Sequence, residues 1–317
     1  MTGLGGCPVV VAIGGNALVR RGERGTAEEQ LAHVRECMLP VSRLIKSGRR
    51  VIVTHGNGPA VGNLLLQMEC AREAVSPMPL YIADADSEGG IGLMVQQALY
   101  NFLHGSRDVG VVTVVTQVVV DPSDPAFTKP SKPVGPYMTH KEARLKEVTS
   151  GWVTKGDDIN GYRRVVPSPM PLRIIEAATI KRLSGAGDVV IAAGGGGVPV
   201  IEDSEGLLFG VDAVIDKDAA ACLLAREVGA GLLVILMEEA AVYTGYGTPD
   251  ARPIGAISAC DLKALLSAGE FAPGSVGPKV AAAVDFVVSG AGEAIITSPE
   301  LLEAALAGIA GTRVTGT

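Results

Sequence analysis

One segment decides the fold, Val9-Val10-Val11-Ala12-Ile13-Gly14-Gly15-Asn16, in which an apolar run leads directly into two glycines and an asparagine. A short, uninterrupted apolar run is typical of a strand that is buried on both faces of a parallel sheet. The same arrangement returns where Val51 to Thr54 precedes Gly56-Asn57-Gly58, and where Val189 to Ala193 precedes Gly194 to Gly197. The sequence therefore predicts a sheet in which several parallel strands end in glycine.

Segments with helical periodicity separate these strands. Apolar residues recur at steps of three and four at Leu31, Val34, Met38, Val41 and Ile45. Further helices are expected around 61–68, 91–103, from Ala219 onward and around 280–287, and further strands at 109–120, 232–237 and 294–296. Strands that alternate with helices indicate an α/β fold with a mainly parallel central sheet covered by helices.

The composition limits what the chain can bind. It has 317 residues, 47% of them apolar, which is enough for a large core and about two domains or lobes. The net charge of −7 argues against a broad binding surface for nucleic acid or anionic membrane. No apolar stretch reaches the roughly 20 residues of a membrane span, since Thr113, Thr116 and Gln117 interrupt the longest one. We therefore expect no nucleic-acid or membrane partner.

Two features favour the cytoplasm. The first basic residue is Arg20, so the N-terminus lacks the charged region of a secretory signal. The five cysteines are odd in number, scattered and without a pair at metal-binding spacing, a pattern typical of reduced interior thiols. We expect neither a disulfide framework nor a zinc site.

Residues 121–171 differ from the rest of the chain. They hold eight of the 19 prolines, in two clusters at the two ends of the segment. Because proline fixes φ and cannot donate to a sheet, we interpret the clusters as stiff exits from the sheet rather than as strands. The segment has a net charge of +2 in a protein whose total is −7. It is expected to form an inserted, basic subdomain.

The glycine-rich strand ends predict a phosphate site. The carboxyl ends of parallel strands form the ligand crevice of such folds, and bare backbone before a helix offers N–H donors to an anion. The alternative, that glycine only closes tight turns, explains a single loop more easily than three. The chain lacks G-x-x-x-x-G-K-[ST], and Gly56-x-Gly58 continues to Gly62, one residue too far for G-x-G-x-x-G. A Walker NTPase and a Rossmann dehydrogenase are both disfavoured.

A phosphoryl site without those motifs needs cations from elsewhere in the chain. Three lysines stand in rigid settings: Lys132 in a proline-rich turn, Lys217 between two aspartates, and Lys279 after a Gly-Pro pair. Asp216 and Asp218 either orient Lys217, ligate magnesium or cap a helix. No cluster of His, Cys, Asp or Glu has metal spacing, and no G-x-S-x-G elbow supports hydrolase chemistry.

The ordered motifs of the chain resemble those of carbamate kinases, within the amino acid kinase superfamily. The resemblance runs nearly from end to end and rests on Val10 to Ala17, Thr54 to Pro59, Gly62 to Leu65, Thr116 to Pro122, Lys132 to Pro136, Arg164 to Pro169, Gly194 to Val200, Ala213 to Asp218 and Phe271 to Ser275. The run from Thr116 to Pro122 and the insertion with its Lys-Pro pair look like carbamate kinase itself, rather than acetylglutamate kinase or uridylate kinase.

The resemblance implies a three-layer αβα sandwich that forms a homodimer, with a small subdomain protruding over the active site. It divides the chain into an acceptor and phosphate-binding lobe at 1–120 and 172–225, the subdomain at 121–171, and a nucleotide-binding lobe at 226–317. The implied reaction is the reversible, Mg²⁺-dependent transfer of a phosphoryl group between ATP and carbamate, giving ADP and carbamoyl phosphate. The implied cellular role is catabolic and ATP-forming, as in arginine metabolism.

The resemblance also implies roles for single residues. Lys132 reaches the phosphoryl group from the subdomain, and Lys217 and Lys279 neutralise its charge. Asp216 holds the lysines in place. Phosphate and carbamate are cradled by Gly14, Gly15, Asn16, Gly56, Asn57, Gly58, Gly195 and Gly196. The nucleotide lies against Met237, Tyr243, Tyr246, Val276, Pro278 and Lys279. No protein residue is implied as a metal ligand, because the nucleotide phosphates hold most of the Mg²⁺ coordination.

The chain departs from the family pattern at three places. The family usually reads Thr-x-Val where this chain has Met237-Glu238-Glu239. It typically has Ser or Thr followed by Gln-Gly where this chain has Asp86-Ser87-Glu88 followed by glycine. The third departure is Asn160, which replaces an arginine. Glu88 is expected to place an acid near the phosphate site and to weaken anion binding. Two alternatives stay open: a kinase of this superfamily with another small carboxylate or phosphonate acceptor, and a non-catalytic nucleotide or metabolite sensor on the same scaffold.

Overall fold

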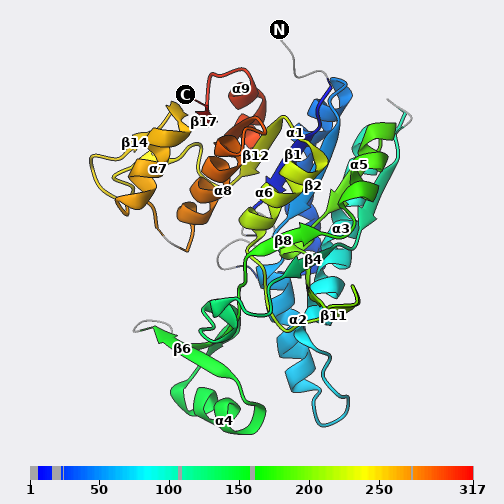
Figure 1. The fold of residues 1–317 in the computed structure, drawn as a ribbon, viewed down its shortest axis with the longest axis vertical. Coiled ribbons are helices and arrows are strands. Elements are labelled where there is room, and N and C mark those ends of the chain that lie inside the picture. Colours follow the sequence, from blue (N-terminus) through cyan, green and yellow to red (C-terminus); the bar gives the residue numbers. More distant parts are fainter. Residues whose placement is uncertain are drawn as a thin grey trace.

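The computed structural model describes residues 6–15, 23, 25–105, 109–157, 161–272 and 274–316 (Figure 1). Its largest sheet has eight strands in the order β15-β17-β16-β12-β1-β2-β9-β3. These strands are β1 (Val9–Ile13), β2 (Val51–His55), β3 (Val111–Val114), β9 (Val189–Ala192), β12 (Leu232–Leu236), β15 (Ala256–Ser258), β16 (Glu293–Thr297) and β17 (Thr312–Thr315). All neighbours are parallel except β16 and β17, which confirms the mainly parallel sheet.

Strand β1 lies inside this sheet and shows why the apolar run was informative. Val9 pairs with Leu232 on one side and with Val51 on the other. Alternate residues of β1 enter two different cores, Val11 on one face of the sheet and Val10 on the other. A strand that is covered on both faces has no solvent-facing positions, so the alternation of polar and apolar residues disappears.

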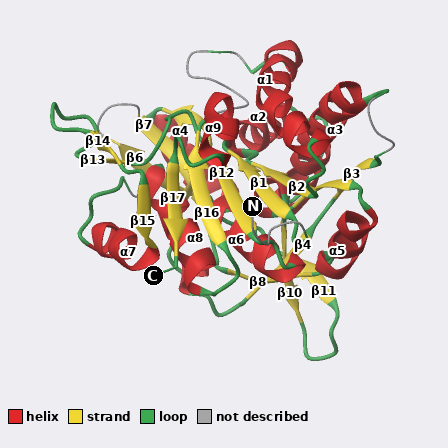
Figure 2. Cartoon of the chain, turned by 90° about the horizontal axis from the view of Figure 1, so that it is seen from above, coloured by secondary structure: helices red, strands yellow, loops and turns green. Residues whose placement is uncertain are grey.

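Helices cover both faces of the sheet (Figure 2). One layer contains α1 (Ala27–Lys46), α3 (Leu80–Leu103) and α9 (Leu302–Leu306), and the other contains α5 (Ala177–Ala186), α6 (Lys217–Val228), α7 (Ala259–Ser267) and α8 (Val276–Val288). Helix α1 begins with a capping box, in which Thr26 accepts from the Glu29 N–H and the Glu29 side chain bonds back to Thr26 N–H. The three-layer αβα sandwich is confirmed.

The strand expected at 109–120 is in fact two strands in two sheets. β3 ends at Val114 in the main sheet, and β4 (Gln117–Val120) joins a second sheet in the order β11-β10-β4-β8. The other strands of that sheet are β8 (Pro171–Ile174), β10 (Val198–Glu202) and β11 (Leu208–Gly210). At the break, the Thr116 hydroxyl donates to the Val114 carbonyl and accepts from the Ala193 N–H. The prediction of one strand was wrong because apolar composition does not reveal where a chain changes sheets.

Three strands between residues 132 and 166 form a third sheet, which protrudes from the body (Figure 1). Its order is β5-β7-β6, and this part contains β5 (Lys132–Met138), α4 (His140–Ser150), β6 (Val153–Asp157) and β7 (Gly161–Val166). The expectation that the proline clusters lie outside strands was wrong for Pro133 and Pro136, in β5, and for Pro171, in β8. Both strands are at the edge of their sheets, where a missing N–H donor breaks no ladder.

The remaining elements are α2 (Gly58–Cys70), the hairpin of β13 (Tyr243–Thr244) and β14 (Arg252–Pro253), and short 3-10 turns at Pro125–Phe127, Gly194–Gly196 and Pro299–Leu301. No helix in the described part of the chain is both long enough and apolar enough to cross a membrane. All five cysteines are free; Cys37 and Cys222 are buried, whereas Cys7, Cys70 and Cys260 are exposed. The expectation of interior thiols was therefore wrong for three of them.

Candidate active site

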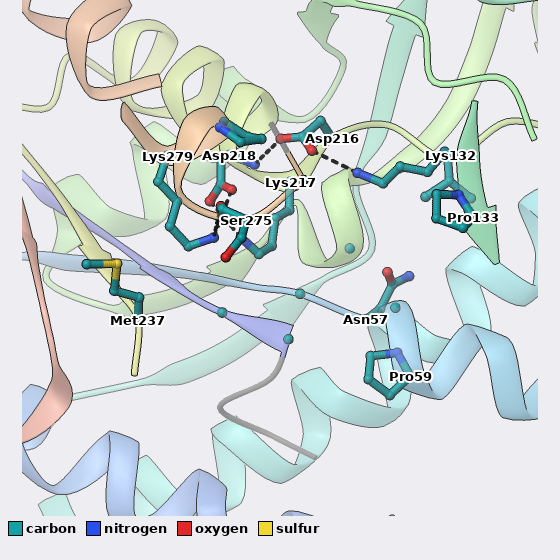
Figure 3. Close-up of a pocket in the computed structure, with 18 of the residues that line it drawn as sticks. Asn57, Pro59, Lys132, Pro133, Asp216, Lys217, Asp218, Met237, Ser275 and Lys279 are labelled. Atoms are coloured by element: carbon teal, nitrogen blue, oxygen red, sulfur yellow. Dashed lines mark hydrogen bonds and ion pairs between the residues drawn. The ribbon is translucent and has the colours of Figure 1, made fainter. Parts of the chain in front are cut away.

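Three strand ends meet at one edge of the main sheet. Strands β1, β2 and β9 are neighbours, and the chain turns directly after each of them. The turns bound a cavity of about 310 Å³ (Figure 3). Of the predicted phosphate and carbamate residues, the cavity is lined by Gly14, Gly15, Gly56, Asn57, Gly58 and Gly195. Gly196 does not line it, and Asn16 lies outside the described residues.

The first two turns touch each other. A Cβ atom added to Gly56 would lie 2.7 Å from the Gly15 nitrogen and 3.0 Å from Cδ of Lys217. Backbone therefore takes the place of side chains in this wall of the cavity. Because a bare backbone offers N–H donors at short range, the wall is suited to an anionic ligand.

Lys132 reaches the cavity from β5 of the protruding sheet. Its Nζ lies 2.7 Å from Oδ2 of Asp216. The other carboxylate oxygen of Asp216, Oδ1, accepts backbone hydrogen bonds from Asp218 at 3.0 Å and Ala219 at 3.3 Å, so that Asp216 is the N-cap of α6. The same side chain caps a helix and orients a lysine, one oxygen for each task.

Lys217 and Lys279 share a second carboxylate (Figure 3). Asp218 Oδ1 is 2.6 Å from Lys217 Nζ, and Oδ2 is 3.4 Å from Lys279 Nζ. Asp218 is 2% exposed, so both ammonium groups are tied to a rigid point. Among the described residues, Asp216 bonds Lys132 and Asp218 bonds the other two lysines. Asp216 was expected to hold the lysines in place; the structure pairs it directly with Lys132, and pairs Asp218 with Lys217 and Lys279.

The charges in this cluster influence one another. Burial alone would raise the pKa of Asp216, but the Lys132 ammonium group and its hydrogen bond, together with the Lys217 charge and the Ala219 N–H, hold the pKa below its usual value. The pKa of Lys279 is lowered, first by burial and then by the charge of Lys217. An anion bound beside these lysines would relieve their mutual repulsion.

Met237 lies across the cavity from Lys132 (Figure 3), and Glu238, Glu239, Val276 and Pro278 also line the cavity. Tyr243 and Tyr246 do not line this cavity. They line a neighbouring one of about 140 Å³, which shares Glu239 and Val276 with the first. The Tyr246 hydroxyl donates to Glu239 at 3.1 Å. The departure at Glu238-Glu239 thus places two acids at the cavity, while the departure at Asn160 lies outside the described residues.

Glu88 has a different position from the one expected. It is 1% exposed and does not line the cavity. One carboxylate oxygen accepts from the Gly194 N–H at 2.8 Å, and the other accepts from the Thr116 N–H at 3.1 Å. Burial raises the pKa of Glu88 to about 8, although both hydrogen bonds oppose the shift. The expectation of an acid facing the phosphate site was wrong, because the carboxylate points into the backbone behind a glycine turn.

Sequence reasoning missed the polar face of α3 to which Glu88 belongs. The helix begins at Leu80, well before the expected start at 91. Asp84, Ser87 and Glu88 are at helical spacing, and each is 3% exposed or less. The available signal was this set of polar residues at steps of three and four. The search for apolar periodicity found the helix from residue 91 onward but not its first part, where polar side chains are buried.

Two of the four carboxylates that line the cavity, Asp216 and Asp218, are engaged with lysines. Within the described ranges, no three side chains of His, Cys, Asp or Glu are grouped so that they could hold a metal ion. Asp216 and Asp218 line the cavity, but both are bonded to ammonium groups. This set fits a magnesium ion that arrives on phosphate oxygens, because Mg²⁺ usually takes only one or two carboxylates from a protein.

The chain matches the family model described as "Amino acid kinase family" over residues 8–298. A carbamate kinase of Pyrococcus horikoshii is 45% identical over 310 residues, which cover 97% of this chain and 98% of the relative. A carbamate kinase-like protein of Escherichia coli (strain K12) is 42% identical, over 96% of this chain and 98% of the relative. The solved structure of a carbamate kinase from Giardia lamblia bound to AMP-PNP is similar with a TM-score of 0.92 at 40% identity, covering 98% of this chain and 99% of that one. The chain therefore belongs to the carbamate kinases, within the amino acid kinase family.

Proposed function

We propose that the protein catalyses reversible phosphoryl transfer between ATP and carbamate, giving ADP and carbamoyl phosphate. The observation that carries this proposal is the convergence of Lys132, Lys217 and Lys279 on one cavity whose facing wall is glycine backbone. Phosphoryl transfer needs positioning and neutralisation of charge more than covalent help from the protein. The similarity to carbamate kinases supports the choice of acceptor.

Each group at the cavity has a role in this proposal. Lys132 contacts the transferred phosphoryl group, and Lys217 and Lys279 neutralise the charge that it shares with the nucleotide. Asp216 and Asp218 hold these lysines in position. The three glycine turns, with Asn16 and Asn57, cradle phosphate and carbamate. Carbamate already presents an anionic oxygen to phosphorus, so the reaction requires no general base.

The nucleotide occupies the other side of the cavity in this proposal. It lies against Met237, Val276, Pro278 and Lys279, with Tyr243 and Tyr246 at the adjoining cavity. Mg²⁺ would enter as part of the nucleotide substrate and would reduce the charge of its phosphate groups. The segments 1–120 and 172–225 then supply the acceptor site, 226–317 supplies the nucleotide site, and 121–171 supplies Lys132.

The cellular setting is a further part of the proposal. We place the enzyme in the cytoplasm, as a homodimer that works in the ATP-forming direction of a catabolic route such as arginine metabolism. Light scattering on the purified protein tests the dimer, since a mass near twice 32.5 kDa supports it and a mass near 32.5 kDa excludes it.

The first experiment is ATP formation from ADP, Mg²⁺ and carbamoyl phosphate by the purified protein. We expect fast turnover that falls strongly in the alanine variants of Lys132, Lys217 and Lys279. The absence of ATP from a protein that still binds ADP would exclude the proposed reaction. Calorimetric titration with ADP, run on the same preparation, separates loss of binding from loss of chemistry.

A second candidate is a kinase of the same family that phosphorylates another small carboxylate or a phosphonate, or a sensor that binds the nucleotide without turnover. The acids Glu238 and Glu239 at the cavity favour it, because they add negative charge beside the phosphate site and Glu239 stands where the family pattern has valine. ADP binding without ATP formation from carbamoyl phosphate would support this candidate. A panel of small acyl phosphates would then distinguish the other acceptor from the sensor.

A further inference from the structure

The Asn57 side chain is held from behind by helix α3. Its Nδ2 donates to Ser87 Oγ at 2.8 Å and lies 3.5 Å from Asp84 Oδ1. The Ser87 hydroxyl donates its own proton to the Asp84 carbonyl oxygen at 2.9 Å. Because a hydroxyl has only one proton, a lone pair of Ser87 faces Asn57, and the amide nitrogen is the matching atom.

The turn after β9 holds the same amide from the other side. A Cβ added to Gly195 would overlap Nδ2, Cγ and Oδ1 of Asn57, so the glycine backbone packs directly on the amide group. Gly195 has φ 72°, a conformation that residues with side chains rarely adopt. The Asn57 amide is therefore clamped between α3 and the glycine turn and has one defined orientation.

This orientation leaves the amide oxygen as the polar atom on the cavity side. Asn57 lines the cavity and points into it (Figure 3). The nitrogen is directed to Ser87 and Asp84, while Oδ1 accepts no hydrogen bond from the residues that the structure describes. A hydrogen-bond acceptor thus stands among lysines and glycine N–H groups, all of which are donors.

A hydrogen-bond acceptor at this point cannot bond ionised phosphate oxygens, which are acceptors themselves, but it can accept a hydrogen bond from an amino group. We propose that Asn57 Oδ1 is the specificity-determining acceptor for the amino group of carbamate and carbamoyl phosphate, and that Ser87 and Asp84 are the positioning residues that aim it. This inference rests on the proposed function. Acetate and acetyl phosphate have a methyl group in place of the amino group and nearly the same shape. With them the buried oxygen stays unpaired, which costs binding free energy that shape alone would not cost.

The test compares carbamoyl phosphate with acetyl phosphate as phosphoryl donors to ADP in the presence of Mg²⁺. The measured quantity is the ratio of the two kcat/KM values in the unsubstituted protein and in Asn57→Leu and Ser87→Ala. Ser184→Ala is the matched control, because Ser184 is also a buried serine but lies on α5. Thermal unfolding of each variant reports whether it is folded.

The unsubstituted protein should favour carbamoyl phosphate, and Asn57→Leu should lower the ratio about tenfold, the equivalent of one buried hydrogen bond. Ser87→Ala should lower it in the same direction, whereas Ser184→Ala should leave it unchanged. Structural damage alone would reduce both kcat/KM values together and preserve the ratio. An unchanged ratio in folded Asn57→Leu or Ser87→Ala would overturn the inference. If the unsubstituted protein forms ATP from neither donor, the proposed function is overturned, and the inference with it.

Discussion

Glu88 Oε1 accepts a hydrogen bond from the backbone N–H of Gly194 at 2.8 Å and so joins helix α3 to the glycine turn that follows β9. Its other oxygen accepts from the Thr116 N–H, at the point where the chain leaves the main sheet. Buried backbone donors are costly when unpaired, and one carboxyl group here satisfies two of them. Gly195, the next residue, lines the cavity, so Glu88 supports the site from outside it.

This position makes the stability of the protein depend on pH. The pKa of Glu88 is raised by burial to about 8, from its ordinary value of 4.5. Between these values the folded protein keeps a proton that the unfolded chain has lost, so the free energy of unfolding falls as pH rises. His55 has the opposite effect on stability, because burial lowers its pKa from 6.5 to about 4. Its contribution makes the free energy of unfolding rise with pH, but only at pH values below about 6.5.

We therefore expect Glu88→Gln to flatten the pH dependence above about pH 6.5. A single group of this kind changes the free energy of unfolding by roughly 1 kcal/mol per pH unit between about pH 6.5 and 8. Urea unfolding of both proteins at several pH values in that range measures the two slopes. Asp84, whose pKa burial also raises to about 8, contributes equally to both proteins. Identical slopes would show that Glu88 is already ionised in the folded state.

Lys132→Ala should separate catalysis from nucleotide binding. Lys132 enters the cavity from the protruding sheet, opposite the side assigned to the nucleotide. Loss of one charge that stabilises the transition state typically lowers turnover about 100-fold to 1000-fold. We expect a loss of that order in ATP formation, with ADP affinity nearly unchanged by calorimetry. Lys129→Ala, which removes an exposed lysine three residues earlier, is the control. A normal rate in Lys132→Ala would remove this residue from the mechanism.

Two substitutions at Asp216 should separate its two tasks. Asp216→Asn keeps an oxygen for the cap of α6 but loses the charge that pairs with Lys132. We expect it to lower kcat with a small loss of stability. Asp216→Ala also removes the cap, which should cost about 1 kcal/mol more in the free energy of unfolding. Denaturant unfolding and steady-state kinetics on both variants provide the comparison. Equal stability of the two variants would argue that the cap contributes little.

Alanine substitutions at Gly56 and Gly58 test whether the first two turns must lie close together, because only one of the two glycines is at their contact. A Cβ at Gly56 would lie 2.7 Å from Gly15 N, whereas a Cβ at Gly58 would meet nothing within 4 Å. We expect Gly56→Ala to cost about 1–3 kcal/mol in the free energy of unfolding through overpacking. Gly58→Ala, at the start of α2, should be neutral or stabilising by up to about 1 kcal/mol. Similar unfolding midpoints for both variants would mean that the turns move apart freely.

The sequence determined the layers of this fold and where its strands end. The run from Val9 to Ile13 has no polar alternation because both faces of β1 are covered, and that pattern is visible without a structure. Glycine directly after β1, β2 and β9 marked the cavity edge, because only bare backbone allows turns such as Gly15 and Gly56 to approach so closely. The lysines were recognisable from their rigid neighbours in the chain.

Only the tertiary structure decided which groups meet. The division of 109–120 between two sheets, the edge position of Pro133 and the partners of Asp218 depend on contacts between residues far apart in sequence, which local propensity does not encode. The same holds for Glu88. From the sequence, Glu88 was expected to be an acid near the phosphate site. In the structure, α3 directs its side chain toward the backbone, where it accepts hydrogen bonds from the N–H groups of Gly194 and Thr116. The sequence shows which chemical groups a side chain carries, but the packing of the whole chain determines which partner those groups meet.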